Sequence, residues 1–150
     1  MSAVRARTAV ALAVGLVLAL LSAACTVDEP DAEAWRDLAR QSLDDVASEV
    51  ATTRLTLTQL AEDRLPTSYG VTVLVSAEQA VSAAEDGLGS VQPPEGLDRR
   101  ADQVLDLIGS AADAVQRARE AVVAGQVLVP HLVDRLRTLQ DTLDRRRAAL

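Results

Sequence analysis

Apolar residues recur at alternating spacings of three and four along four stretches of the chain, which is the pattern of helices that bury one face. A strand buries every second residue instead, so this spacing favours helices. We call these apolar positions the seam of each stretch. They are Leu43, Val46, Val50, Thr53, Leu57 and Leu60, with Trp35 and Leu38 upstream; Leu74, Ala77, Val81, Ala84 and Leu88; Leu97, Ala101, Val104, Ile108, Ala111, Val115, Ala118 and Val122; and Val129, Leu132, Leu136, Leu139 and Leu143.

Proline, glycine and capping residues divide these stretches into four predicted helices, at about residues 31-64, 68-88, 97-124 and 129-149. Proline cannot continue a helix, glycine is typical just after a helix end, and a hydroxyl or carboxylate side chain caps a helix start. The boundary signals are Pro30 and Asp31; Leu65, Pro66, Thr67 and Ser68, with a capping hydroxyl for the second helix; Gly87, Gly89 and the run VQPPEG; Gly125; and Pro130. Because the connections are short, the pattern predicts an all-α fold, an antiparallel up-down-up-down four-helix bundle over residues 31-150.

Residues 51-60, with the sequence ATTRLTLTQL, also fit a second pattern. Alternating Thr and Leu suits a β-strand, because period two and β-branching both favour one. A strand here would have nothing to pair with in an otherwise helical chain, so we assign these residues to the first helix. Thr53 then takes a seam position, where we expect its hydroxyl to bond to a carbonyl one turn back.

The first 24 residues have the pattern of an export signal. Arg5 and Arg7 are the only charges before Asp28, and they precede 17 uncharged residues that end in small side chains. Residues 1-24 are therefore predicted to be a signal peptide. The alternative is an uncleaved anchor helix, although at 1.5 Å per residue the run would reach about 26 Å, slightly less than a hydrocarbon core of roughly 30 Å.

The sequence Leu21-Ser22-Ala23-Ala24-Cys25 resembles the lipobox of bacterial lipoproteins. In the commonest form of that motif the leucine stands three residues before the cysteine, where this chain has Ser22. The resemblance implies that a diacylglyceryl group is attached to the sulfur of Cys25 and that the signal is cleaved just before it. It places the protein outside the cytoplasm, anchored to the outer face of the cell membrane, with residues 25-30 as an acidic tether. Stable anchoring needs more than one acyl chain.

Charge excludes one class of function. Without residues 1-24 the chain carries 22 acidic and 13 basic residues, a net charge of −9. Binding to nucleic acid needs a clustered cationic face, and binding to single strands usually adds aromatic stacking platforms. The chain has one tryptophan, Trp35, one tyrosine, Tyr69, and no phenylalanine, so we expect no nucleic-acid partner.

Searches for catalytic and metal-binding motifs find none. The chain has no HExxH, CxxC, GxSxG, P-loop or dinucleotide-binding motif. His131 is the only histidine, and no second histidine or cysteine stands near it, so a surface or capping role is favoured over a zinc site. We therefore expect no enzymatic activity, no cofactor and no metal.

Two functions fit what is left. The first is an interaction or structural module of the cell envelope, a monomeric bundle that is held at the membrane by its lipid and presents helix surfaces to an envelope protein. The second is a carrier or sensor of a small ligand, with a cavity where the seams of the second and third helices are rich in alanine. Alanine at a seam more often marks close helix packing, and no convergent polar groups are visible inside the seams, so the first function is favoured.

Five arginines are expected to gather at the membrane-proximal end of such a bundle. They are Arg99 and Arg100 at the start of the third helix and Arg145, Arg146 and Arg147 at the end of the fourth. One interpretation is a basic cluster that faces anionic head groups. The other is that the last three arginines only complement the helix dipole and pair with Asp141 one turn back.

Overall fold

The computed structural model describes residues 31–126 and 130–150, and these residues form four helices and no strand. The helices are α2 (Ala32–Ala61), α3 (Thr67–Gly89), α4 (Asp98–Val123) and α5 (Pro130–Ala148). The prediction of an all-α fold is confirmed for the described part of the chain. Each helix begins and ends within three residues of its predicted bounds.

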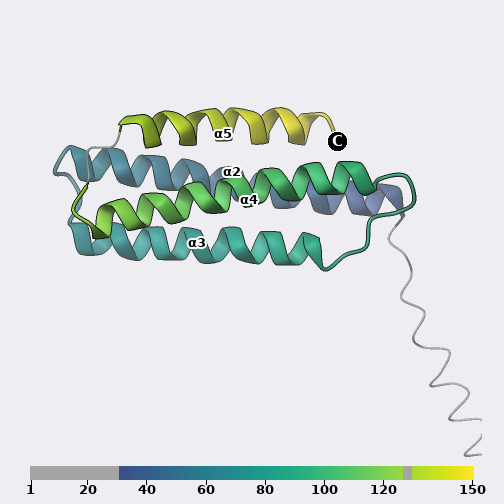
Figure 1. Ribbon diagram of the computed structural model, residues 1–150, viewed down its shortest axis with the longest axis horizontal. Coiled ribbons are helices and arrows are strands. Elements are labelled where there is room, and N and C mark those ends of the chain that lie inside the picture. The colour runs from purple at the N-terminus through teal and green to yellow at the C-terminus, as the bar shows by residue number, and fades with distance from the viewer. Residues whose placement is uncertain (1–30, 127–129) are drawn as a thin grey trace, which may run out of the picture.

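The four helices lie lengthwise beside one another (Figure 1). α2 packs against α3 and α5, and α4 packs against α3 and more lightly against α2 and α5. Within the described residues α3 and α5 make no contact, so α2 is the helix that touches every other one. The start of α2, the α3–α4 connection and the C-terminus lie toward one end of the molecule, which we call the near end. The end of α2, the start of α3 and the end of α4 lie at the opposite, far end.

The core follows the predicted seams closely. Most seam residues are buried, and the exceptions Leu38, Ala84, Leu97 and Leu139 are half-buried and pack against the core. Val129 lies outside the described residues. Alanines on the flanks of the seams add to the core because they let the helices approach closely. The buried residues beyond the predicted seams are Ala39, Ser42, Ala47, Thr56, Gly70 and Ala114.

The starts of two helices differ in how they are capped. Asp31 caps α2 as predicted, and its side chain accepts hydrogen bonds from two backbone N–H groups of the first turn. The predicted hydroxyl cap of the second helix is wrong. Pro66 takes the capping position before α3, and the cap makes no side-chain hydrogen bond, because the helix already includes Thr67.

The ends of two helices test the predicted glycine signals. Gly125, with φ +74°, follows the last turn of α4, and its N–H bonds to the carbonyl of Val122 at 3.0 Å, so the predicted stop is confirmed. The break predicted from Gly87, Gly89 and the run VQPPEG is also found, because the second helix ends one residue after its predicted bound of 88. α3 runs through both glycines to Gly89, and the chain leaves the helix at Ser90, ahead of two prolines that cannot continue it.

The threonine-rich stretch lies in the last half of α2, so the strand alternative is overturned. Thr53 is fully buried at the seam as predicted. Its hydroxyl, however, has no hydrogen-bond partner among the described residues, so the expected bond to a carbonyl one turn back is absent there. Thr56 and Thr58 make that bond instead, to the carbonyls of Thr52 at 2.8 Å and Arg54 at 2.9 Å.

Candidate functional site

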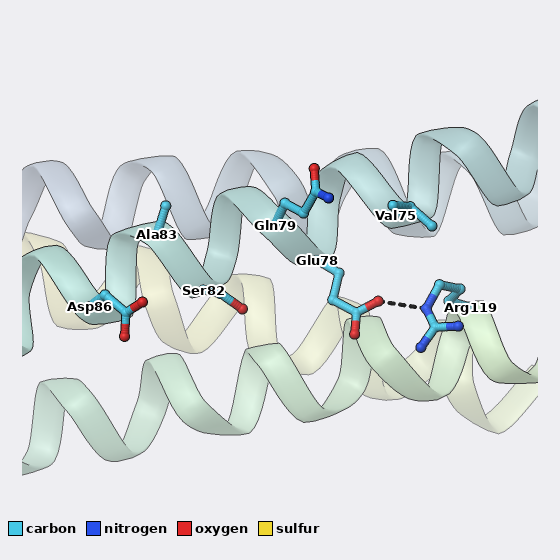
Figure 2. Close-up of a pocket in the computed structure, with 7 residues that line it drawn as sticks. All are labelled: Val75, Glu78, Gln79, Ser82, Ala83, Asp86 and Arg119. Carbon is cyan, nitrogen blue, oxygen red and sulfur yellow. Dashed lines mark hydrogen bonds and ion pairs between the residues drawn. The ribbon is translucent and has the colours of Figure 1, made fainter.

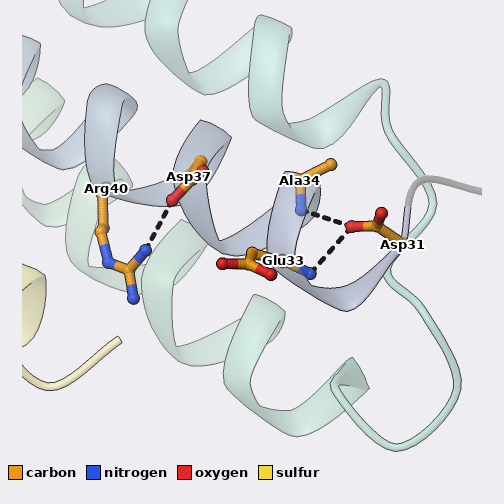
Figure 3. A network of polar contacts seen from close by, with 5 residues as sticks. All are labelled: Asp31, Glu33, Ala34, Asp37 and Arg40. Carbon is orange, nitrogen blue, oxygen red and sulfur yellow. Dashed lines mark hydrogen bonds and ion pairs between the residues drawn. The ribbon is translucent and has the colours of Figure 1, made fainter.

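Cys25, the predicted lipid attachment residue, lies with the predicted signal outside the described residues. The described chain begins at Asp31, six positions later, and enters α2 at once (Figure 3). Asp31 Oδ1 accepts from the N–H groups of Glu33 at 3.0 Å and Ala34 at 2.7 Å, which fixes the start of the helix. One turn on, Trp35 is fully buried. A folded helix therefore begins immediately after the predicted tether.

The three arginines at the end of α5 point to different partners. Arg147 forms an ion pair with Asp44 of α2 and a longer one with Asp144, at 3.7 Å. Arg145 donates to the hydroxyl of Thr142 at 3.0 Å. None of the three pairs with Asp141 in the described part of the chain, so the expected pairing one turn back is wrong. The negative charge that compensates Arg147 comes mainly from another helix.

Arg146 leans toward the start of α4. Its Nη1 donates to Oε1 of Gln103 at 3.1 Å. Gln103 also lines a surface hollow with Gly96, Asp98, Arg99 and Arg100. Both of these arginines are exposed, and neither forms an ion pair within the described residues. Arg99, Arg100 and Arg146 are therefore brought together at the near end, whereas Arg147 is tied to α2.

A second surface feature lies along the flank where α3 faces α4. Arg119 of α4 and Glu78 of α3 form an ion pair of 2.5 Å, with side chains 28% and 30% exposed (Figure 2). The hydrogen bond and the charge of Glu78 raise the pKa of Arg119 above its ordinary value. The pair borders a hollow that is also lined by Val75, Gln79, Ser82, Ala83 and Asp86.

Apolar side chains are exposed beside this ion pair. Val75 stands one turn before Glu78 on α3 and is 37% exposed, and Val123 stands one turn after Arg119 on α4 and is 63% exposed. Residues three or four apart on a helix share a face, so both valines lie on the flank of the ion pair. We call Val75, Glu78, Arg119 and Val123 the α3–α4 flank. Arginine is enriched in protein interfaces, so this flank is a candidate contact surface.

The seam spacing does not predict the α3–α4 flank, although the sequence holds a signal for it. Glu78 is the only charged residue from Pro66 to Ala84, so it stands out in an otherwise neutral helix. Its partner Arg119 is 41 positions away on another helix. Periodicity within one helix cannot show which residue of the neighbouring helix it meets.

Three further observations concern the histidine, metal binding and membrane spans. His131 is exposed at the start of α5. Within residues 31–126 and 130–150, no group of three or more histidine, cysteine, aspartate or glutamate side chains is arranged to hold a metal ion. None of the helices described has the length and apolar character needed to cross a bilayer.

Comparison of the chain with family models, with curated proteins and with solved structures found no match.

Proposed function

We propose that this protein is a lipid-anchored, extracytoplasmic module of the cell envelope that binds another envelope protein through its helix surfaces. The anchor is the diacylglyceryl group expected on Cys25 after cleavage of residues 1-24. Residues 25-30 form the tether, and the bundle follows. The α3–α4 flank is the surface that meets the partner.

The observation that carries this proposal is where exposed apolar side chains lie. In the part of the chain that the structure describes, four large hydrophobic side chains are exposed: Leu55, Tyr69, Val75 and Val123. Each belongs to the half of its helix that is directed to the far end, away from the predicted anchor. A tethered module that meets its partner away from the membrane would expose apolar surface at that end.

The bundle proposed here has antiparallel up-down-up-down topology. Supporting this, consecutive helices connect at alternate ends in Figure 1. The first turn of α3 lies close to the end of α2, because a Cβ on Gly70 would come within 2.8 Å of Leu60 Cδ1. This topology returns the C-terminus toward the near end.

The alternative function is a carrier or sensor of a small ligand that uses a cavity in the bundle. Such a carrier needs an enclosed, mainly apolar cavity. Each of the hollows around Arg119, around Arg99 and around Glu49 lies open on the surface and has charged side chains in its lining.

The anchor is tested by replacing Cys25 with Ser in the full chain. Serine has no sulfur to form the thioether bond to the lipid. We therefore expect the variant to be unprocessed or unlipidated, and to shift out of the membrane fraction that detergent extracts. Mass spectrometry of the N-terminus identifies the lipid. If the Ser variant stays fully in the membrane fraction, the uncleaved anchor helix replaces the lipid in this proposal.

The partner surface is tested by crosslinking in intact cells. Val123→Arg places a charge on the exposed apolar part of the α3–α4 flank and should abolish a crosslinked product formed by the wild type. Asp134→Arg, an exposed site on α5, is the control and should keep it. If both variants keep the product, the partner binds elsewhere on the protein.

A further inference from the structure

We propose that Arg99, Arg100 and Arg146, which we call the near-end arginine surface, bind the anionic phospholipid head groups of the membrane and hold the near end of the bundle against it. The proposal deepens the function proposed above and rests on it, because a lipid on Cys25 is what brings this surface to the bilayer.

These three arginines keep their positive charge uncompensated. Arg146 donates to the amide oxygen of Gln103, which is neutral, and within the described chain neither Arg99 nor Arg100 has a carboxylate within ion-pair distance. Arg147 differs, because Asp44 and Asp144 offset its charge. Arg145 forms no ion pair in the described chain either, but its bond is to Thr142 within α5, so the surface proposed here is limited to the arginines at or in contact with the start of α4.

Arg99 and Arg100 lie at the start of α4, and Arg146 of α5 contacts the same part of that helix. Gln103 is three and four positions after Arg100 and Arg99, so all three residues share a helix face. The contact between Arg146 and Gln103 brings the end of α5 to that same face. The hollow on this face is lined by one carboxylate, Asp98, and by Arg99 and Arg100, and Arg146 bonds to Gln103, which also lines it.

Position and charge together identify the occupant. Cys25 and Asp31 are six positions apart, which spans at most about 22 Å of extended chain, so the near end cannot leave the neighbourhood of a lipid on Cys25. Residues 31–150 carry 13 arginines and 20 acidic residues, so an anionic surface repels most of the molecule. The near-end arginine surface complements the charge of the anionic head groups. The favoured orientation of the bundle is therefore the one that turns this surface to them.

The expected size of the effect can be stated as a ratio. A basic side chain close to an anionic leaflet changes an equilibrium by about fivefold, so three arginines shift the ratio of membrane-facing to freely tilting bundles by about 125-fold at low salt. The Debye length is about 10 Å at 0.1 M salt, so the shift should shrink steeply as salt is added.

The experiment uses the full, lipid-bearing chain in vesicles that contain head-group-labelled dansyl lipid. Trp35 is the only tryptophan, and it lies in the first turns of α2 at the near end, so energy transfer from it to dansyl reports how close that end sits to the bilayer. We expect greater transfer in vesicles with anionic lipid than in neutral vesicles. The variant Arg99→Gln/Arg100→Gln/Arg146→Gln should lose that increase.

The matched control removes three arginines elsewhere, Arg64→Gln/Arg117→Gln/Arg137→Gln, each of which is exposed and ion-paired. It carries the same net charge as the test variant and should keep the increase. The proposal is overturned if wild-type transfer is equal in both vesicle types, if the test variant keeps the increase, or if the control loses it too.

Flotation of the vesicles separates this proposal from the anchor. A lipid-bearing chain floats with neutral vesicles whether or not its arginines are present. If it fails to float with them, the lipid anchor has failed. Flotation with anionic vesicles that disappears in the test variant would then still support the near-end arginine surface, and flotation that persists in it would overturn the surface as well.

Discussion

At the scale of single residues, the apolar spacing predicts correctly where Thr53 lies but not which hydrogen bond its hydroxyl makes. Its place on the seam follows from spacing alone, and it is fully buried there. Whether the hydroxyl reaches a carbonyl depends on its χ1 rotamer, which splits between two wells for threonine in helices. Thr56 and Thr58 take the rotamer that bonds back, and Thr53 does not.

Replacing Thr53 with Val should therefore stabilise the protein. Valine has nearly the same shape and removes a buried hydroxyl that has no partner, which costs about 1 kcal/mol or more. Thr56→Val is the matched control, because it removes a hydroxyl that bonds to the carbonyl of Thr52. Urea unfolding should give a higher midpoint for Thr53→Val and a lower or equal one for Thr56→Val. The opposite order would mean that the Thr53 hydroxyl has a partner in solution.

Asp63 offers a second prediction at this scale. It is the only residue other than glycine with positive φ in the described chain, at 53°, where it follows the end of α2. Its N–H bonds to the carbonyl of Leu60, and that of Arg64 to Gln59, as in a helix stop that normally uses glycine. Asp63→Gly should raise the free energy of unfolding by about 0.5 to 1 kcal/mol, and Asp63→Ala should lower it. Equal urea midpoints for the two variants would contradict the left-handed conformation.

At the scale of helices, punctuation and periodicity were enough to place all four elements. Proline and the apolar spacing act within one turn, so their effect is readable from local sequence. The sequence predicts less well which residue caps each helix. The predicted hydroxyl cap of α3 is absent, because Pro66 takes the capping position and its cap makes no side-chain hydrogen bond.

The seam of α4 gives the prediction for this scale. Val104 is fully buried in the middle of that seam, so Val104→Asp would leave an unpaired charge in the core and should cost about 3 to 5 kcal/mol. Val123→Asp makes the same substitution on the same helix at an exposed site and should cost less than about 1 kcal/mol. Thermal unfolding followed by circular dichroism measures both. An unchanged melting temperature for Val104→Asp would refute the seam.

The candidate surfaces were harder to predict than the helices, and the arginines show why. Sequence order and alternating helix direction indicated that Arg99 and Arg146 would approach one another. The length of the side chains and the rotation of α5 decide which carboxylates they meet, and these are tertiary properties. Asp44, the partner of Arg147, is 103 positions away and had no sequence signal at all.

At the scale of the whole molecule, stability is distributed unevenly among the helices. Among the helices that the structure describes, α2 contributes eleven buried residues and touches the other three, whereas α5 contributes three, Leu132, Leu136 and Leu143. α5 packs mainly on α2 and lightly on α4. A segment that buries few residues is prone to open without unfolding the rest. Loss of α5 would uncover the α2 face beneath it but leave α2, α3 and α4 packed on one another.

We therefore expect hydrogen exchange in the full chain to show α5 as the least protected helix, with its amides exchanging through a local opening and those of α2 only through global unfolding. The ion pair between Arg147 and Asp44 holds the end of α5 to α2, so Arg147→Gln should speed exchange in α5 by up to about fivefold, the effect of an exposed pair. Arg137→Gln is the control, because the partner of Arg137 is Asp134 within α5 itself, and it should change exchange far less. Mass spectrometry of peptides from each helix measures these rates. Equal protection of α5 and α2 would show that the four helices open as one unit.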